Sequence, residues 1–149
     1  MQFYDDADAC PVKDEALKVA GRYQSVIHFV SNSHMRLPES ALVRRVVVTD
    51  GPDAADDWIA ERIGKGDIAV TADIPLAWRC LKKGARVVGP TGKPFTEAGI
   101  GMALAMRDLS RHLRETGESR GFNADFTRQD RSRFLEALEA AVQAIKRGG

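Results

Sequence analysis

The sequence FYDDADACP, at residues 3–11, is a short apolar run that ends in acidic residues and leads directly into a helical pattern. The sequence DIAVTADIP, at residues 67–75, has the same order: a strand-like run, then an acid, then a helix that starts at a proline. In α/β proteins the carboxyl ends of parallel strands meet at one edge of the sheet, and ligands bind there. Two such units therefore predict a parallel sheet with acidic side chains along one edge.

Further strands and helices alternate along the rest of the chain. Apolar runs predict strands at residues 2–6, 25–30, 45–48, 67–71 and 86–88. Apolar residues at helical spacing predict helices at residues 11–22, around Ala55, Ile59 and Ile63, at 74–83, at 96–116, and after a capping box at 127–130. Residues 89–94 hold two prolines and two glycines and predict a loop. The alternation indicates an α/β fold, with three α/β/α layers around a mainly parallel central sheet, in one domain over residues 1–149.

The composition is that of an ordinary globular protein, with 44% apolar and 29% charged residues. A net charge of +1 argues against nonspecific binding to long nucleic acids, which normally requires a strong basic excess. The first residues form no secretory signal, and no apolar run approaches the roughly 20 residues that span a bilayer. The two cysteines, Cys10 and Cys80, are therefore expected to be reduced thiols. We expect a cytoplasmic protein.

Acidic residues gather where three of the predicted strands end. Asp6 and Asp8 follow the first strand, Asp73 follows the fourth, and the sequence DAADD at residues 53–57 opens the helix after the third. Like charges at close range raise each other's pKa unless a cation lies between them. Carboxylate oxygens of this kind suit Mg²⁺ or Mn²⁺. The pattern therefore predicts a divalent metal site.

Helix capping is the alternative interpretation of the same acids. Asp8, Asp53 and Asp73 each stand at the start of a predicted helix, where aspartate accepts hydrogen bonds from free backbone N–H groups. Capping explains single aspartates but not the combination of Asp5, Asp6 and Asp8, because at least one of these has no helix end to cap. The cluster as a whole favours a metal site.

Four strings of this sequence resemble the YaiI/YqxD family of bacterial proteins of unknown function. They are DADACP at 6–11, DAAD at 53–56, TADIPLA at 71–77 and MRDL at 106–109. The resemblance implies a PIN-like, nuclease-type fold. It also implies that Asp6, Asp8, Asp56 and Asp73 match the metal-binding carboxylates of PIN-type nucleases, and that Asn32 and Arg107 match positions near that pocket. The position of Asp57 is often another polar residue in the family, so Asp56 is the preferred candidate.

The leading hypothesis is a divalent-metal-dependent phosphodiesterase or ribonuclease, acting on RNA or another nucleic acid with Mg²⁺ or Mn²⁺. The expected catalytic and metal-binding residues are Asp6, Asp8, Asp56 and Asp73. Thr71 and Asn32 would orient water or ligands, and Arg107 would contact a phosphate.

Two other functions stay open at this point. One is a small-molecule phosphatase, because an Asp-x-Asp sequence after a first strand also serves aspartyl-phosphate chemistry. The other is a noncatalytic RNA-binding or regulatory protein whose acidic pocket is stabilised by a metal. Exposed apolar residues on the last helix would permit a homodimer.

Overall fold

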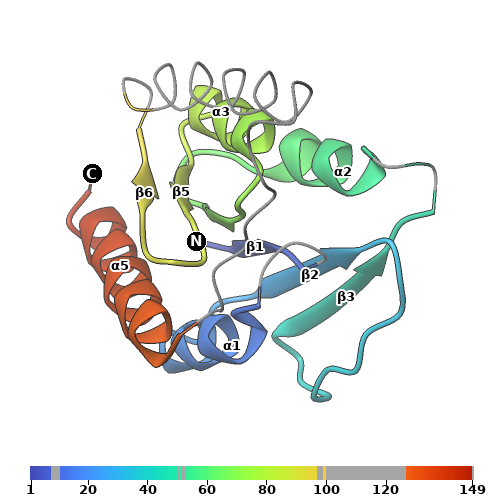
Figure 1. Cartoon of the computed structure of the whole chain (residues 1–149), viewed down its shortest axis with the longest axis horizontal. Coiled ribbons are helices and arrows are strands. Elements are labelled where there is room, and N and C mark those ends of the chain that lie inside the picture. The colour runs from blue at the N-terminus through green and yellow to red at the C-terminus, as the bar shows by residue number, and fades with distance from the viewer. Residues whose placement is uncertain (8–10, 50, 52, 97–98, 100–126, 149) are drawn as a thin grey trace, which may run out of the picture.

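The computed structural model describes residues 1–7, 11–49, 51, 53–96, 99 and 127–148. These residues form a six-stranded sheet with helices on both faces (Figure 1). The strands are β1 (Phe3–Asp6), β2 (Ile27–Ser31), β3 (Val43–Val47), β4 (Ile68–Val70), β5 (Arg86–Val88) and β6 (Pro94–Phe95). The helices are α1 (Lys13–Arg22), α2 (Ala54–Arg62), α3 (Ile74–Lys82) and α5 (Arg128–Lys146). The predicted α/β class and its three layers are confirmed.

The strand order is β3-β2-β1-β4-β5-β6, and strands β1 to β5 are parallel. The chain moves outward from β1 to β2 and β3, then returns to the other side of β1 to form β4 and β5. The order therefore reverses between β1 and β4, where an open parallel sheet offers a crevice for ligands. Asp5 pairs with Val70 in the register of these two strands, so Asp6 and Thr71 follow next at the same edge.

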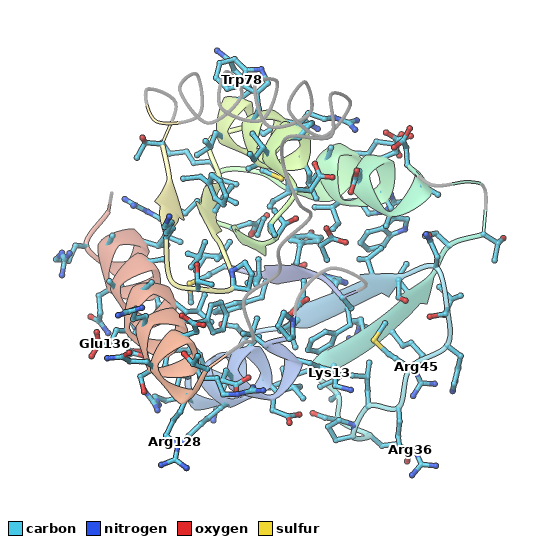
Figure 2. The ribbon with its side chains drawn as sticks, in the orientation of Figure 1. Lys13, Arg36, Arg45, Trp78, Arg128 and Glu136 are labelled. Atoms are coloured by element: carbon cyan, nitrogen blue, oxygen red, sulfur yellow. The ribbon has the colours of Figure 1, made fainter. Side chains whose placement is uncertain are left out.

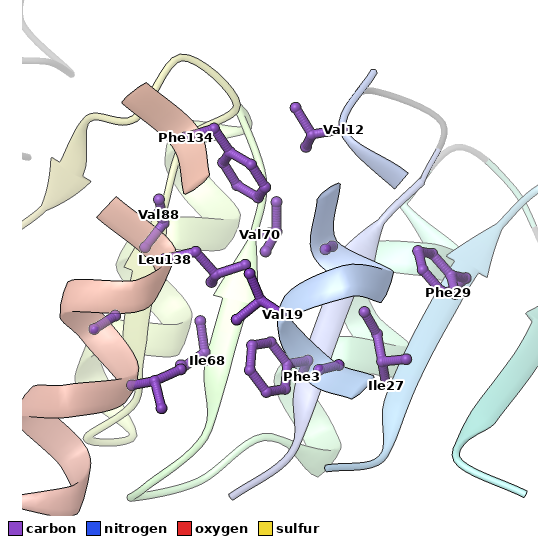
Figure 3. Close-up of a cluster of buried hydrophobic side chains, with 14 of the residues drawn as sticks. Phe3, Val12, Val19, Ile27, Phe29, Ile68, Val70, Val88, Phe134 and Leu138 are labelled. Atoms are coloured by element: carbon purple, nitrogen blue, oxygen red, sulfur yellow. The ribbon is translucent and has the colours of Figure 1, made fainter. Parts of the chain in front are cut away.

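Two apolar clusters join the helices to the sheet. α1 and α5 cover one face, and β1 contributes Phe3 to that cluster (Figure 3). α2 and α3 cover the opposite face, where β1 contributes Tyr4. Each fully buried large apolar side chain stabilises the fold by roughly 1.5–3 kcal/mol. Because successive strand residues point to opposite faces, Asp5 lies on the face of Phe3 and Asp6 on the face of Tyr4.

The last helix begins where its sequence predicts. The Thr127 hydroxyl accepts a hydrogen bond from the Asp130 N–H at 3.0 Å, and the Asp130 carboxylate accepts one from the Thr127 N–H at 3.1 Å. This reciprocal pair is the predicted capping box, and it is confirmed. Two strands are displaced from their predicted bounds. The strand predicted at 25–30 is β2 (Ile27–Ser31), and the strand predicted at 45–48 is β3 (Val43–Val47). The ends of these strands are set by pairing with neighbouring strands, and this pairing cannot be deduced from the local apolar pattern.

The predicted loop at residues 89–94 is wrong at its last residue, because Pro94 pairs with Val88 in the antiparallel strand β6. Gly92 has a φ of +91°, a backbone conformation that favours glycine, and this allows the chain to reverse. A proline is tolerated in β6 because the strand lies at the end of the sheet order, where one N–H is not needed.

Most of the predicted helix at 96–116 lies outside the described residues, as do Asp8 and Arg107. Among the helices that the structure describes, none combines the length and the hydropathy of a membrane-spanning segment.

Candidate functional site

Asp6 and Thr71 lie together at the point where the strand order reverses. Asp6 is the last residue of β1, and Thr71 directly follows β4. The Thr71 hydroxyl donates a hydrogen bond to Oδ2 of Asp6 at 2.8 Å. Both residues are buried, with 0% of Thr71 and 5% of Asp6 exposed. The hydroxyl therefore fixes one carboxylate oxygen of Asp6 at the crevice between the two strands.

The turn from β4 into α3 brings Asp73 to the same edge. The Asp73 N–H donates to the Thr71 hydroxyl oxygen at 3.0 Å, so Thr71 connects both aspartates. Oδ1 of Asp73 accepts a hydrogen bond from the Leu76 N–H at 2.9 Å and caps α3. Capping is therefore confirmed for Asp73. It uses one carboxylate oxygen, and a carboxylate has lone pairs on both of its oxygens.

Asp56, in the first turn of α2, lies in the electrostatic field of the other acids. Burial is the main cause that raises its pKa, and the carboxylates of Asp73, Asp6 and Asp53 add to it, so that the pKa of Asp56 rises to about 6. The guanidinium of Arg79 opposes this shift. Asp56 therefore lies within electrostatic reach of acids from β1 and from the start of α3.

Asp53 stands at the N-cap position of α2 but, within the described residues, its side chain makes no capping hydrogen bond. The capping interpretation is therefore not seen for Asp53. Asp57 has different surroundings from its neighbour Asp56, because its Oδ1 pairs with Nη1 of Arg79 at 2.8 Å on the surface. The structure thus separates Asp57, which forms an ion pair with Arg79, from Asp56, whose pKa is raised by burial and by neighbouring acids.

Asn32 directly follows β2 and is exposed at the same edge of the sheet. The remaining predicted residues, Asp8 and Arg107, are outside the described part of the chain. Within that part, no group of three or more His, Cys, Asp or Glu side chains is arranged to hold a metal ion. The oxygen donors nevertheless suit Mg²⁺, which is commonly bound through one or two carboxylates together with waters and substrate phosphates.

Asp5 was grouped with the neighbouring acids in the sequence, yet it lies on the opposite face of the sheet. Its side chain is 0% exposed, and neither carboxylate oxygen has a hydrogen-bond partner among the described residues. Burial and then the charge of Asp6 raise its pKa well above the usual range, while Lys13 opposes the shift. The alternation of side chains along a strand is the signal that separates Asp5 from Asp6.

Comparison with known proteins accounts for nearly the whole chain. The model of the "Uncharacterized BCR, YaiI/YqxD family" matches residues 4–144. The chain belongs to the YaiI/YqxD family. A UPF0178 protein of Rhodospirillum rubrum is 61% identical to it over 149 residues, covering 99% of both chains. A UPF0178 protein of Parvibaculum lavamentivorans is 62% identical over 146 residues, covering 98% of this chain and 96% of the relative. No solved structure matches the chain.

The YaiI/YqxD resemblance predicted from four sequence strings is therefore confirmed at the level of the family. Three of the four candidate carboxylates in this YaiI/YqxD protein are described: Asp6, Asp56 and Asp73. They come from three separate elements and are electrostatically coupled at Asp56. Thr71 was predicted as a ligand-orienting residue, and its hydroxyl is hydrogen-bonded to the candidate carboxylate of Asp6.

Proposed function

We propose that this protein is a divalent-metal-dependent phosphodiesterase that cleaves RNA or another nucleic acid. One observation carries the proposal: Thr71 connects Asp6 and Asp73 where the strand order reverses, through hydrogen bonds of 2.8 Å and 3.0 Å. The carboxylates of both aspartates add to the burial that raises the pKa of Asp56 to about 6. Such like-charge crowding is costly in the absence of a cation, and perturbed acids of this kind gather at functional sites. The chain belongs to the YaiI/YqxD family. The PIN-like, nuclease-type fold that the sequence resemblance implies for this family supports the same proposal.

Asp6, Asp56 and Asp73 would hold Mg²⁺ or Mn²⁺, together with Asp8 of the predicted set. When bound, such an ion lowers the pKa of its water and stabilises the leaving oxygen in phosphodiester cleavage. Thr71 fixes the orientation of Asp6 through its hydrogen bond of 2.8 Å. Asn32 would orient water or ligands and Arg107 would contact a phosphate, which leaves the acids to bind the metal.

Three conservative variants test the proposal. Parent protein and the variants Asp6→Asn, Asp56→Asn and Asp73→Asn are incubated with a pool of short single-stranded and structured RNAs and Mn²⁺ or Mg²⁺. Asparagine at position 73 keeps the helix cap, since asparagine and aspartate cap equally well. Asparagine at position 6 still offers an oxygen to Thr71. The folds are therefore expected to persist while cleavage falls by about 10²-fold or more, because each change removes a charged metal ligand.

Asp57→Asn is the matched control, because it makes the same chemical change one residue from Asp56. Its carboxylate pairs with Arg79 at the surface, so cleavage should stay close to the parent rate. Parent-like cleavage by Asp6→Asn and Asp73→Asn would overturn the assignment of these residues. A parent protein that cleaves no RNA while Mn²⁺ raises its melting temperature would favour the noncatalytic binding protein, and release of phosphate from small phosphomonoesters would favour the phosphatase.

A further inference from the structure

A polar cavity of about 340 Å³ lies on the other face of the sheet from Asp56 and Asp73. It lies between the start of α1, the carboxyl ends of β1 and β2, and the first turn of α5. The polar and charged residues lining it are Lys13, Asp14, Ser31, Ser33 and Arg131. Ala7 also lines it and directly follows Asp6 in the chain, so the end of β1 contributes to both the acidic site and this cavity.

Two cations reach the cavity from different helices. Lys13, at the start of α1, donates a hydrogen bond from Nζ to the backbone carbonyl of Arg36 at 3.2 Å, which places its ammonium near the segment after β2 (Figure 2). Arg131, in α5, is oriented by Glu15, whose Oε1 accepts from Nη1 at 2.7 Å. The Pro11 carbonyl accepts from the same nitrogen at 3.3 Å. The two positive charges are thus placed by contacts with separate partners.

Hydroxyl groups and a helix end complete the lining. Ser31 is buried, with 2% exposed, and its oxygen accepts the Ser33 N–H at 3.0 Å. The two serine hydroxyl oxygens lie 3.4 Å apart. The N-cap residue of α1 is Val12, which, among the described residues, provides no side-chain hydrogen bond to the first turn. The free N–H groups and dipole of such a helix end favour negative charge.

The acidic side chains at the cavity do not prevent an anion from binding there. Asp14 is exposed to solvent, which screens its charge, and Glu15 is paired with Arg131. Ammonium, guanidinium, hydroxyl groups and a helix N-terminus are together the donors that recognise phosphate. A phosphomonoester needs several of these donors because it carries close to two negative charges near neutral pH.

We propose that this cavity binds the terminal phosphate of a nucleic-acid strand whose adjoining phosphodiester reaches the acidic site. The inference rests on the proposed function, and it names the substrate class more closely: a strand with a phosphorylated end. Lys13 and Ser33 contact the phosphate, and Arg131 supplies positive charge. Because β1 ends between the two sites, a strand anchored in the cavity is directed toward Asp6.

The test is a binding measurement on the full chain without metal. Fluorescently labelled oligonucleotides of one sequence, carrying a 5′-phosphate, a 3′-phosphate or only hydroxyl ends, are titrated in EDTA. One phosphorylated form is expected to bind at least roughly tenfold more tightly than the hydroxyl form, as charge-assisted hydrogen bonds would provide. Lys13→Gln and Ser33→Ala should reduce that preference, and Lys13→Gln should remove most of it. Lys18→Gln, an exposed charge change on the same helix, should leave it intact.

Inorganic phosphate serves as the competitor that separates the possible sources of the anion. If inorganic phosphate competes only at a concentration well above that of the oligonucleotide, the result supports recognition of a strand end. If inorganic phosphate binds as tightly as the phosphorylated oligonucleotide, and Lys13→Gln weakens that binding, the cavity is a site for free phosphate. No preference for a phosphorylated end and no binding of inorganic phosphate would overturn the proposal, as would a full preference in Lys13→Gln. Repeating the titration with Asp6→Asn keeps the two proposals apart, because end recognition should survive the loss of cleavage.

Discussion

Thr71 and Asp6 are 65 residues apart in the chain, and the Thr71 hydroxyl donates to the Asp6 carboxylate at 2.8 Å inside the protein. The same hydroxyl oxygen accepts the N–H of Asp73, so one side chain connects two candidate metal ligands. Asp6 ends β1 and Thr71 directly follows β4, and these two strands pair directly in the sheet. A threonine in this position works as a positioning residue, because it fixes the oxygens that would face a metal.

Replacing Thr71 with valine removes this connection without changing the shape of the side chain much. The buried Asp6 carboxylate and the part-buried Asp73 N–H each lose a hydrogen-bond partner, which should lower the free energy of unfolding by about 1–3 kcal/mol. Cleavage should fall by roughly tenfold or more, because a misplaced ligand weakens metal binding. Urea unfolding and the dependence of the cleavage rate on the Mn²⁺ concentration measure the two effects. Thr71→Ser keeps the hydroxyl, so this variant should retain most of the stability and most of the cleavage rate of the parent. A valine variant with parent-like stability and metal affinity would contradict the positioning role.

Asp56 should make the metal-free protein less stable as the pH rises. Burial, with the carboxylates of Asp73 and Asp6, raises its pKa to about 6 in the folded state. The folded protein therefore binds this proton more tightly than the unfolded chain, whose aspartates titrate near about 4. The stabilising contribution is complete below that lower value and is lost as the pH rises through about 6. Asp56→Asn cannot ionise, so in EDTA its melting temperature should exceed that of the parent at neutral pH.

Thermal unfolding at several pH values checks this expectation. The advantage of Asp56→Asn should shrink as the pH falls toward about 4, where the parent carboxyl is protonated in both states. Asp57→Asn should show no comparable gain, because its carboxylate is paired with Arg79. Saturating Mn²⁺ should reverse the order and favour the parent. An Asp56→Asn variant that is less stable than the parent in EDTA at neutral pH would argue against crowding of like charges.

Cys80 should be inert toward alkylation in the folded protein. It lies at 0% exposure in the apolar cluster beneath α2 and α3, and burial is the main cause that raises the pKa of its thiol to about 12. Only the thiolate reacts, so iodoacetamide should modify it at least roughly a hundredfold more slowly than a thiol in the unfolded chain. The measurement uses Cys10→Ser, which leaves Cys80 as the one remaining cysteine, with and without urea. Rapid modification without urea would show that α3 opens from the sheet.

The sequence predicted most of the fold because local patterns determine most of it. The apolar runs locate the five parallel strands, and the capping box at Thr127 locates the start of α5. The strand β6 was missed because a two-residue strand that contains Pro94 has no apolar pattern of its own. It forms through pairing with β5, which depends on tertiary structure.

Only part of the candidate site could be predicted, because the sequence shows local patterns but not the contacts between distant elements. Acids at strand and helix ends are visible in the sequence, and in the structure the charges of Asp6 and Asp73 act on Asp56. Which side chain each one contacts depends on pairings between distant elements, so the Thr71 hydrogen bond could not be predicted from spacing. The orientation of α2 about its axis separates Asp56 from Asp57, and that orientation is set by packing on the sheet.

Asp5 belongs to the same acidic run of the sequence as Asp6 and Asp8, but the structure places it on the opposite face of the sheet from Asp6. It lies at 0% exposure on the α1 face, where it pairs in register with Phe29 and Val70. Neither of its oxygens has a hydrogen-bond partner among the residues that the structure describes. A buried, unpaired carboxyl costs stability even when it is protonated. A valine at this position would instead match the apolar, β-branched composition of buried parallel strands.

Asp5→Val is therefore expected to raise the free energy of unfolding by about 1–3 kcal/mol, measured by urea denaturation in EDTA. Asp5→Asn is the comparison variant: it removes the ionisable group but leaves polar atoms without partners, so its gain should be clearly smaller. Cleavage should be largely retained in Asp5→Val, because Asp6 points to the opposite face of the sheet and keeps its bond to Thr71. A loss of stability in Asp5→Val would mean that the Asp5 carboxyl has a stabilising partner in solution, and the contrast with Asp5→Asn would then show whether that partner requires its charge.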